Sequence, residues 1–411
     1  LPPRTVFDVS FGWTHNGVAV GASFGFNLGS DAFLFVSFGD FHHRDLMAYR
    51  ILGLDTSGMT TRRWFYFIPA EGEPVKLSHK VEPRKLDPLP GRQEFFLAWR
   101  ELHEKLKAAL GSPKKIAMQY SPMNAIPYVA VVDAGTVELV RSFGHEVVSS
   151  AGLVQEFEAV MDERAYRSHV EAGEIVQRIK DEAFALMDDA LRRGKAITEF
   201  GVKERIVERF REEGLTNDGE SPIVGFNDHP ADPHFEPTRE NAHTLKPGDT
   251  ILVDVWARKD EPLGVYYDIT WCGFAGKNPP AEYSKIFGVV RDARDAALEF
   301  VRGRFAAGRP VHGWEVDDAC REVVAAAGYG NEFIHRTGHS IGVKVHGNGV
   351  NIDNLETRDE RLLVPGICFS IEPGIYLAGR MAVRSEIDVF VTPAGKVEVA
   401  GTMQRDLVLV G

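Results

Sequence analysis

The sequence has 411 residues, of which 44% are hydrophobic and 26% are charged, and its formal net charge is −12. This length predicts two or three domains with a buried core, and the acidic balance, without a cluster of lysine and arginine, argues against a nucleic-acid partner. Three isolated cysteines, Cys272, Cys320 and Cys368, argue against a disulfide framework or a structural zinc site and are typical of a cytoplasmic protein.

The first 160 residues have the pattern of a mixed α/β domain. The opening twenty residues lack a basic region followed by an apolar one, so no signal peptide is predicted, and no apolar run in the chain is long enough to span a membrane. The glycine- and phenylalanine-rich opening has no clear period and predicts no element. Beyond it, the hydrophobic pattern predicts four strands, at 32–38, 63–69, 115–120 and 136–142, and a helix at 94–110.

A long, charged helical pattern at 154–194 marks the change to a second domain. We place the boundary at residue 160, which gives domains 1–160 and 161–411. Three more helices are predicted at 198–214, 280–308 and 313–328, the first with Thr198 as its N-cap. Strand-rich segments punctuated by glycine lie between and after these helices, which predicts an α+β domain.

The pentapeptide GHSIG at 338–342 has the spacing of the nucleophile elbow of serine hydrolases. An elbow leads from a strand into a helix and precedes the catalytic histidine, whereas Ser340 is followed by a β-branched, glycine-rich stretch. We therefore reject the serine-hydrolase interpretation. His335 and His339 have the i, i+4 spacing of zinc proteases, but the glutamate that follows the first histidine there is absent, so we expect one metal ligand at most.

A pair of acids marks the segment 249–274. It predicts two strands around the turn KDEPLG, and a hairpin symmetric about Glu261 places Asp254 opposite Asp268. Directly opposed residues have Cβ atoms about 4.5–5.5 Å apart, and two like charges at that separation repel each other. We therefore expect a cation between these carboxylates, or a proton bound to one of them.

A second hairpin repeats this arrangement, with Glu372 and Glu386 symmetric about Gly379. Together with His339, the acids form a set in the order Asp, Asp, His, Glu, Glu, and its charge of −4 matches two divalent cations. Paired cations can activate water and stabilise a tetrahedral intermediate, and this set suits manganese, cobalt or iron, with zinc also possible. The alternative is a stabilising network of acids paired with arginines such as Arg384.

With these ligands in this order, the chain resembles the pita-bread metallopeptidases, which include prolidases, aminopeptidases P and methionine aminopeptidases. The resemblance covers about residues 160–411 and rests on the fragments LVDVWA, YYDIT, HRTGHSIGVKVHG, FSIEPGIY and VRSEID. It implies a pita-bread α+β catalytic domain after a creatinase-like α/β N-terminal domain. Methionine aminopeptidases typically lack the N-terminal domain, and creatinase does not keep the five metal ligands.

The resemblance also implies roles for individual residues. The implied metal ligands, with Asp268 and Glu386 bridging the two ions, are Asp254, Asp268, His339, Glu372 and Glu386. Glu372 is also the implied general acid/base, His234 contacts the substrate and His346 stabilises the tetrahedral intermediate. The remaining implied roles are the lining of a proline pocket by His335 and the support of the last glutamate by Arg384. Three histidines are interpreted as structural: His229, His243 and His312.

The implied function is hydrolysis of Xaa-Pro dipeptides by a metal-bridging hydroxide, carried out in the cytoplasm by a homodimer, with manganese as the expected metal. A dipeptidase needs a cation for the C-terminal carboxylate of its substrate. Arg358 lies 14 residues before Glu372, where the prolidase pattern places such an arginine, and Arg361 is the second candidate. The alternatives are an aminopeptidase P that acts on longer Xaa-Pro peptides and a non-catalytic pita-bread protein that binds peptides.

Overall fold

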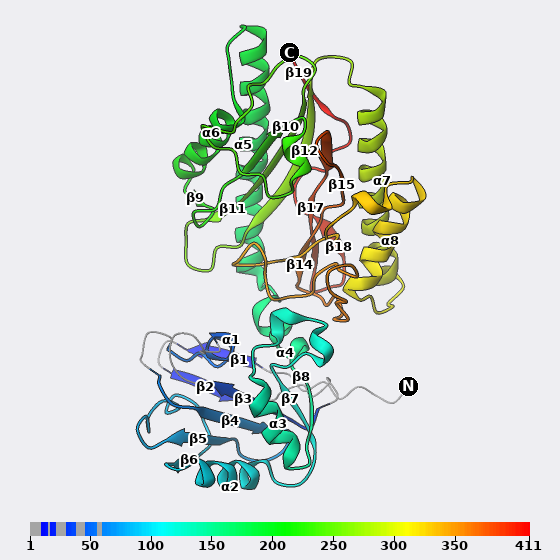
Figure 1. Cartoon of the computed structure of the whole chain (residues 1–411). Coiled ribbons are helices and arrows are strands. Elements are labelled where there is room, and N and C mark those ends of the chain that lie inside the picture. Colours follow the sequence, from blue (N-terminus) through cyan, green and yellow to red (C-terminus); the bar gives the residue numbers. More distant parts are fainter. Residues whose placement is uncertain (1–9, 15–16, 22–29, 38–45, 56–59) are drawn as a thin grey trace. The chain divides into compact units, whose positions relative to one another are not determined.

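The computed structural model describes residues 10–14, 17–21, 30–37, 46–55 and 60–411 (Figure 1). The chain divides into two compact units, residues 1–157 and 158–411. In the glycine-rich opening, β1 (Ser10–Thr14) and β2 (Gly17–Gly21) form an antiparallel pair that the sequence pattern does not predict, and the rest of that stretch up to residue 29 lies outside the described residues.

The N-terminal unit is built on a six-stranded mixed sheet in the order β6-β5-β4-β3-β7-β8. Alternate residues of the strand β3 (Ala32–Ser37) belong to two separate apolar clusters, so both faces of the sheet are covered. The strands are β3 (Ala32–Ser37), β4 (Trp64–Pro69), β5 (Val75–His79), β6 (Arg92–Phe96), β7 (Lys115–Met118) and β8 (Glu146–Ser149). The helices are α1 (Leu46–Ile51), α2 (Trp99–Leu110), α3 (Ala134–Ser142) and α4 (Ala151–Glu158), with 3-10 turns η1 (Pro122–Asn124) and η2 (Pro127–Val129).

Two sequence predictions in this unit are wrong. The expected strand at 136–142 is helix α3, because the Asp133 side chain caps it by accepting from the Thr136 N–H at 2.8 Å, and Val137 and Val140 are buried on one helical face. The expected helix at 94–110 begins only at Trp99, since the residues before it form β6.

The C-terminal unit places its strands between two pairs of helices (Figure 1). One apolar core packs the green α5 and α6 against β10, β11 and β12. A second core packs α7 and α8 against other residues of these three strands and against β14, β15, β16 and β17. The helices are α5 (Glu163–Arg192), α6 (Glu199–Glu212), α7 (Ala281–Ala306) and α8 (Gly313–Ala326), with 3-10 turns η3 (His229–Ala231) and η4 (Gly330–Glu332). Thr198 is the N-cap of α6, as predicted, and accepts from the Gly201 N–H at 3.0 Å.

The strands of this unit form three sheets. One has the order β10-β11-β12-β19 with β9 paired to β11, another has the order β13-β14-β17-β18, and β15 pairs with β16. The first comprises β9 (Leu215–Thr216), β10 (Ile223–Phe226), β11 (Thr250–Lys259), β12 (Tyr267–Ala275) and β19 (Val408–Val410). The others comprise β13 (Ser340–Ile341), β14 (Cys368–Ile371), β15 (Gly374–Leu377), β16 (Met381–Arg384), β17 (Ile387–Val391) and β18 (Val397–Val399).

This arrangement confirms the predicted order of an α/β unit followed by an α+β unit. None of the helices in the described part of the chain combines the length and the apolar character that a membrane crossing requires.

Candidate metal centre

Asp254 and Asp268 are supplied by the neighbouring strands β11 and β12. The prediction that they oppose each other is wrong, because Asp254 pairs with Thr270. The hydrogen-bonded turn begins at Glu261 and has Pro262 at its second position, so the hairpin is centred one residue later than expected. Moving the centre by one residue changes the residue opposite Asp254 by two positions, from Asp268 to Thr270. Because side chains alternate with a period of two, Asp254 and Asp268 still lie on one face of the sheet, as diagonal neighbours.

Glu372 and Glu386 lie between two strand ladders, β14 with β17 and β15 with β16. The residue pairs of both ladders are symmetric about Gly379, as the sequence predicts. Gly379 has a φ of 67° in the connecting turn, a backbone conformation that favours glycine. The two glutamates therefore sit at equal distances along the chain from this turn.

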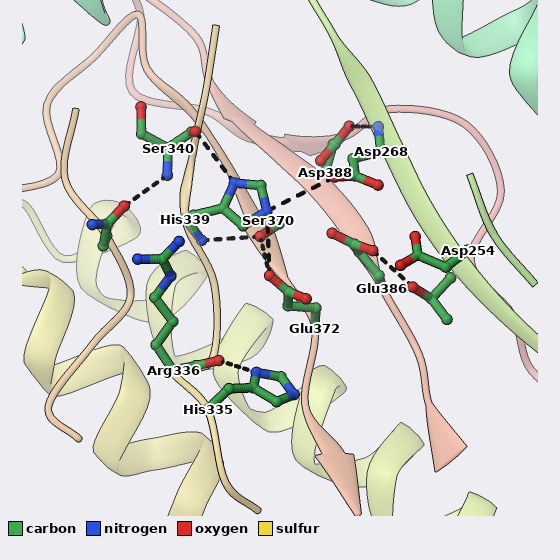
Figure 2. Close-up of polar contacts among 12 residues, drawn as sticks. Asp254, Asp268, His335, Arg336, His339, Ser340, Ser370, Glu372, Glu386 and Asp388 are labelled. Atoms are coloured by element: carbon green, nitrogen blue, oxygen red, sulfur yellow. Dashed lines mark hydrogen bonds and ion pairs between the residues drawn. The ribbon is translucent and has the colours of Figure 1, made fainter. Parts of the chain in front are cut away.

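His339 completes the cluster from the edge of β13. Its Nε2 atom is 3.8 Å from Asp268 Oδ2 and 3.3 Å from Glu372 Oε1. The side chains of Asp268, His339 and Glu386 each offer a ligand atom within 4.8 Å of the other two. Figure 2 shows these side chains and Asp254 converging from separate strands. The structure thus brings together all five residues that the sequence singled out as ligands.

The carboxylates of this cluster are buried without enough donors. In the described part of the chain, Asp254 Oδ1, Asp268 Oδ1 and Glu386 Oε1 are buried oxygens that have no hydrogen-bond partner. Burial, followed by the charge of Asp254, raises the pKa of Asp268 well above its usual range, and burial followed by the charge of Asp268 does the same for Glu386. Burial raises the pKa of Glu372 to about 7.

Divalent cations fit this donor set. A buried carboxylate is costly unless it is paired or coordinates a metal, and the orphaned oxygens belong to acids whose charges act on one another. Burial, followed by the charges of His346 and Arg336, holds the pKa of His339 well below its usual range, so that residue is a neutral imidazole, the form that binds metals. Hard carboxylate oxygens and one imidazole suit divalent first-row metals.

Arg384 is a buried guanidinium that connects several site residues. It pairs directly with Asp254 and donates to Thr270 Oγ1 at 3.1 Å, and Thr270 in turn donates to Glu386 Oε2 at 2.9 Å. Arg384 is therefore connected to the last glutamate by hydrogen bonds through Thr270, and its charge also acts on Glu386. It also donates to the Tyr376 hydroxyl at 3.0 Å. The alternative interpretation, a network of acids paired with arginines, is therefore partly confirmed by the Arg384–Asp254 pair. This pair does not satisfy the whole carboxylate, because Asp254 Oδ1 has no hydrogen-bond partner.

Three histidines surround the cluster. The His335 Nε2 atom is hydrogen-bonded to the Tyr376 hydroxyl at 2.8 Å. The ring of His346 lies edge-on to that of His339, with centroids 4.4 Å apart. His234 is exposed just after η3, which packs against β15 and β16. Burial raises the pKa of Asp254, and the charges of Arg384 and His234 oppose that rise, so His234 lies within electrostatic reach of the cluster.

The two arginines considered for substrate binding lie elsewhere. Arg358 is 58% exposed at its side chain, stacks on the Trp314 ring at 5.0 Å and pairs with Glu360 at 3.4 Å. Arg361 is buried and donates to both oxygens of Asp359 and to the Asn348 carbonyl. Neither makes a contact with the ligand set in the described structure.

Arg336 is an arginine that the sequence prediction did not consider. Its guanidinium points toward His339 (Figure 2), and its charge contributes to the lowered pKa of His339. The backbone around it is fixed, because its N–H donates to Glu356 Oε1 at 2.9 Å and its carbonyl is hydrogen-bonded to His335 Nδ1 at 2.7 Å.

The pentapeptide GHSIG holds a structural serine. Ser340 Oγ accepts from the Gly349 N–H at 3.1 Å, and strand and irregular loop follow it, as the sequence predicts. At Gly338 the backbone approaches β14 so closely that an added Cβ would lie 2.0 Å from the Ser370 carbonyl oxygen. Ser370 also orients the cluster, because its hydroxyl accepts from the His339 N–H at 3.0 Å and donates to Glu372 Oε1 at 3.1 Å.

Several supporting residues were missed by the sequence analysis. Thr270 and Ser370 donate hydrogen bonds to two of the ligands, and Asp388 Oδ2 accepts from the Asp268 N–H at 2.8 Å. Tyr376 is hydrogen-bonded to Arg384 and His335. The signal for Thr270 was strand alternation, since it lies two residues from Asp268 on the same face of β12.

The chain is similar to known peptidases over most of its length. A model of metallopeptidase family M24 matches residues 168–393. An Xaa-Pro dipeptidase from Lactobacillus helveticus is 32% identical over 52% of this chain and 54% of its own length, and the probable dipeptidase PepE from Mycobacterium tuberculosis is 36% identical over 43% of each. The chain thus spans about half the length of the curated relatives it matches.

The crystal structure of dipeptidase PepE from Mycobacterium ulcerans covers 93% of this chain and 94% of its own, with a TM-score of 0.64 and 25% identity. This likeness extends across both units, and the fold prediction is confirmed: a pita-bread domain follows an α/β N-terminal domain.

Proposed function

The chain belongs to metallopeptidase family M24, and from this premise we propose that it is a metal-dependent exopeptidase that hydrolyses Xaa-Pro dipeptides. The observation that carries the proposal is the convergence of Asp254, Asp268, His339, Glu372 and Glu386, with buried carboxylate oxygens that lack partners. The relatives named as dipeptidases, one of them an Xaa-Pro dipeptidase, support the same substrate class.

The five residues would hold two divalent cations. Such cations supply Lewis acidity toward the scissile carbonyl and toward the water that hydrolysis consumes. Manganese is the proposed metal, and cobalt, iron and zinc are compatible with the same ligand types. The low pKa of His339 keeps its nitrogen available without competition from a proton.

Glu372 is the proposed proton carrier. Its side chain is 14% exposed, more than those of Asp268 and Asp254, so it is the carboxylate nearest to entering substrate. The Ser370 hydroxyl donates to its Oε1 atom and fixes its direction. Glu372 takes a proton from the attacking water and delivers it to the proline nitrogen as the C–N bond breaks. That nitrogen carries no hydrogen in the substrate, so the leaving group needs this proton.

His346 and His234 are proposed to contact the substrate carbonyl and its surroundings. His346 is held against His339, and His234 enters from the segment after η3. His335 is proposed to line the proline pocket, where its hydrogen bond to Tyr376 fixes the direction of its ring. Each of the three would orient the substrate, while the metal centre would provide most of the electrostatic stabilisation of the transition state.

A dipeptidase also requires a cation for the C-terminal carboxylate of the substrate. Arg358 was the sequence candidate, but its guanidinium lies on Trp314, whereas that of Arg336 points toward His339. We therefore place Arg336 first and Arg358 second. Replacing the correct arginine by alanine is expected to raise KM for Ala-Pro about tenfold or more and KM for Ala-Pro-Ala much less. Equal effects on both peptides would reject the role for that residue.

The whole proposal is tested by hydrolysis of Ala-Pro, Ala-Pro-Ala and Ala-Ala, with metal-stripped protein before and after addition of manganese. Manganese-dependent cleavage of Ala-Pro alone is the expected result. Cleavage mainly of Ala-Pro-Ala would move the assignment to an aminopeptidase P. No cleavage with any of several metals would favour the non-catalytic, peptide-binding alternative.

A cytoplasmic location and a homodimeric state are part of the proposal. The three cysteines are buried free thiols, which suits a reducing compartment. Size-exclusion chromatography with light scattering tests the homodimer, and a monomeric mass would reject it.

A further inference from the structure

Glu199 is a buried carboxylate outside the metal-ligand set. It is the first residue of α6, and its side chain is fully buried. Its oxygens accept from the Phe226 N–H at 2.6 Å and from the His243 N–H at 2.6 Å. The His229 Nδ1 atom is hydrogen-bonded to both oxygens, at 2.9 and 2.8 Å. These donors satisfy the carboxylate without a metal ion.

The donors to Glu199 belong to one segment of chain, residues 226–243. The segment leaves β10 at Phe226 and returns beside the start of α6, where the Glu199 N–H donates to the His243 carbonyl at 3.1 Å. A single carboxylate therefore joins both ends of the segment. His234 lies eight residues after Phe226 and nine before His243, at the middle of the segment.

The segment has little apolar burial of its own. Between Phe226 and His243, only Pro230 and Pro237 are buried. A second polar anchor exists at Asn227, which is hydrogen-bonded to Asp249 and Thr250. Segments with few buried apolar contacts open most readily, so the position of His234 depends on these polar anchors.

Ring contacts connect His229, the hydrogen-bond partner of Glu199, to the residue that follows His234. The His229 ring stacks on the His243 ring, with centroids 3.6 Å apart, and on the Phe235 ring at 4.1 Å. Phe235 directly follows His234. The carboxylate orients His229, His229 packs on Phe235, and the backbone next to His234 is thereby fixed.

We infer that Glu199 is a positioning residue for His234, which it holds at the metal centre by closing the 226–243 segment. The inference rests on the proposed peptidase function, because His234 is there a substrate contact. Glu199 itself contacts no reacting atom in this scheme and acts through the segment alone.

The test uses Glu199→Gln in the full-length protein, alone and combined with His234→Ala. The glutamine amide nitrogen donates where Glu199 accepts, so one backbone N–H loses its partner. Manganese-dependent kcat/KM for Ala-Pro should fall about tenfold when His234 is present and less than about twofold when His234 is already alanine. Equal losses in both backgrounds would overturn the inference. Glu204→Gln, at an exposed position on the same helix, is the matched control.

Amide hydrogen exchange supplies a readout that does not require activity. Residues 226–243 should exchange faster in Glu199→Gln, while β11 and β12 keep wild-type rates. Unchanged exchange in the segment would overturn the inference, even if the wild-type chain cleaves no Xaa-Pro peptide and the proposed function itself fails.

If Glu199→Gln does not fold, His229→Phe is the second variant. It keeps the ring stacking and removes the hydrogen bond to Glu199. It should give the same loss of kcat/KM that depends on His234, and faster exchange in residues 226–243. An equal loss with and without His234, or unchanged exchange, would then reject the inference.

Discussion

Two clusters in the C-terminal unit combine glutamate or aspartate with histidine, and they differ in what satisfies their oxygens. In the first, Asp268, His339 and Glu386 converge, and buried oxygens of both acids lack donors. In the second, Glu199, His229 and His243 are equally close together, yet backbone N–H groups and an imidazole saturate the carboxylate. From their residue types alone, both clusters would be interpreted as metal sites.

The number of hydrogen-bond donors that a buried acid receives decides its role. A carboxylate that receives several N–H groups has its charge stabilised by hydrogen bonds and serves as a structural anchor. A carboxylate left with an orphaned oxygen beside like charges requires a cation or a bound proton. Four experiments test whether the two clusters differ in this way.

The strongest contrast is between Asp268→Asn and Glu199→Gln. Asp268→Asn should reduce manganese-dependent Ala-Pro hydrolysis about 1000-fold or more, because a ligand is lost from the centre that supplies the Lewis acidity. It should also lower the bound manganese measured by elemental analysis, whereas Glu199→Gln should retain the full metal content. Loss of metal from Glu199→Gln would erase the distinction between the clusters.

Arg384→Gln tests whether the first cluster needs cations once its arginine is gone. The change leaves Asp254 buried without its partner, and breaking such a pair costs about 3–5 kcal/mol. We expect the free energy of unfolding of the metal-free protein to fall by about this amount, with a smaller loss when manganese is bound. Urea unfolding with and without manganese measures both, and an identical loss would contradict the compensation.

The pH dependence of stability should change sign with metal. The pKa of Glu372 rises from 4.5 to about 7 on folding, so the folded metal-free protein binds more protons than the unfolded chain between these values. Glu372 should therefore contribute a loss of stability as pH rises from about 4.5 to about 7. His335 and His346, whose pKa values burial lowers to about 3 and about 4, contribute in the opposite direction. Cations bind the deprotonated carboxylates, so the loaded protein should gain stability over the same range. Thermal unfolding across this range is the measurement, and parallel slopes would be inconsistent with a metal centre.

His243→Ala should have the smallest effect. The His243 backbone N–H still donates to Glu199, and the exposed ring contributes its stacking on His229 and a 3.9 Å approach of Nδ1 to Asp228 Oδ1. We expect a stability loss of about 0.5–1.5 kcal/mol and kcat/KM within a few-fold of wild type. Thermal unfolding and Ala-Pro kinetics measure these effects, and a loss comparable to that of His339→Ala would show that the second cluster is catalytic.

The five proposed ligands were predictable because strand spacing and turn residues carry a strong local signal. The symmetry about Gly379 followed from sequence, whereas the first hairpin was misjudged by one residue at its centre, since Pro262 rather than Glu261 sets the turn. The same-face relation of Asp254 and Asp268 survived, because a shift of two residues preserves the strand face.

Long-range contacts were not predictable in the same way. Glu199 looked like an ordinary first-turn acid of a helix, and only the return of the chain at His243 gives it a different role. Arg336 and Arg358 illustrate the same limit, because spacing from Glu372 says nothing of where a guanidinium points. The helix at 134–142 was missed, since a short run with two valines fits both periods until its cap at Asp133 is recognised.

The close approach at Gly338 has a consequence for how such chains are classified. A side chain at this position would collide with the Ser370 carbonyl oxygen, so close packing of two chain segments demands the first glycine of GHSIG. A pattern search for serine esterases will retrieve this sequence. What distinguishes it from an esterase is the structure after Ser340, which is strand and irregular loop instead of a helix.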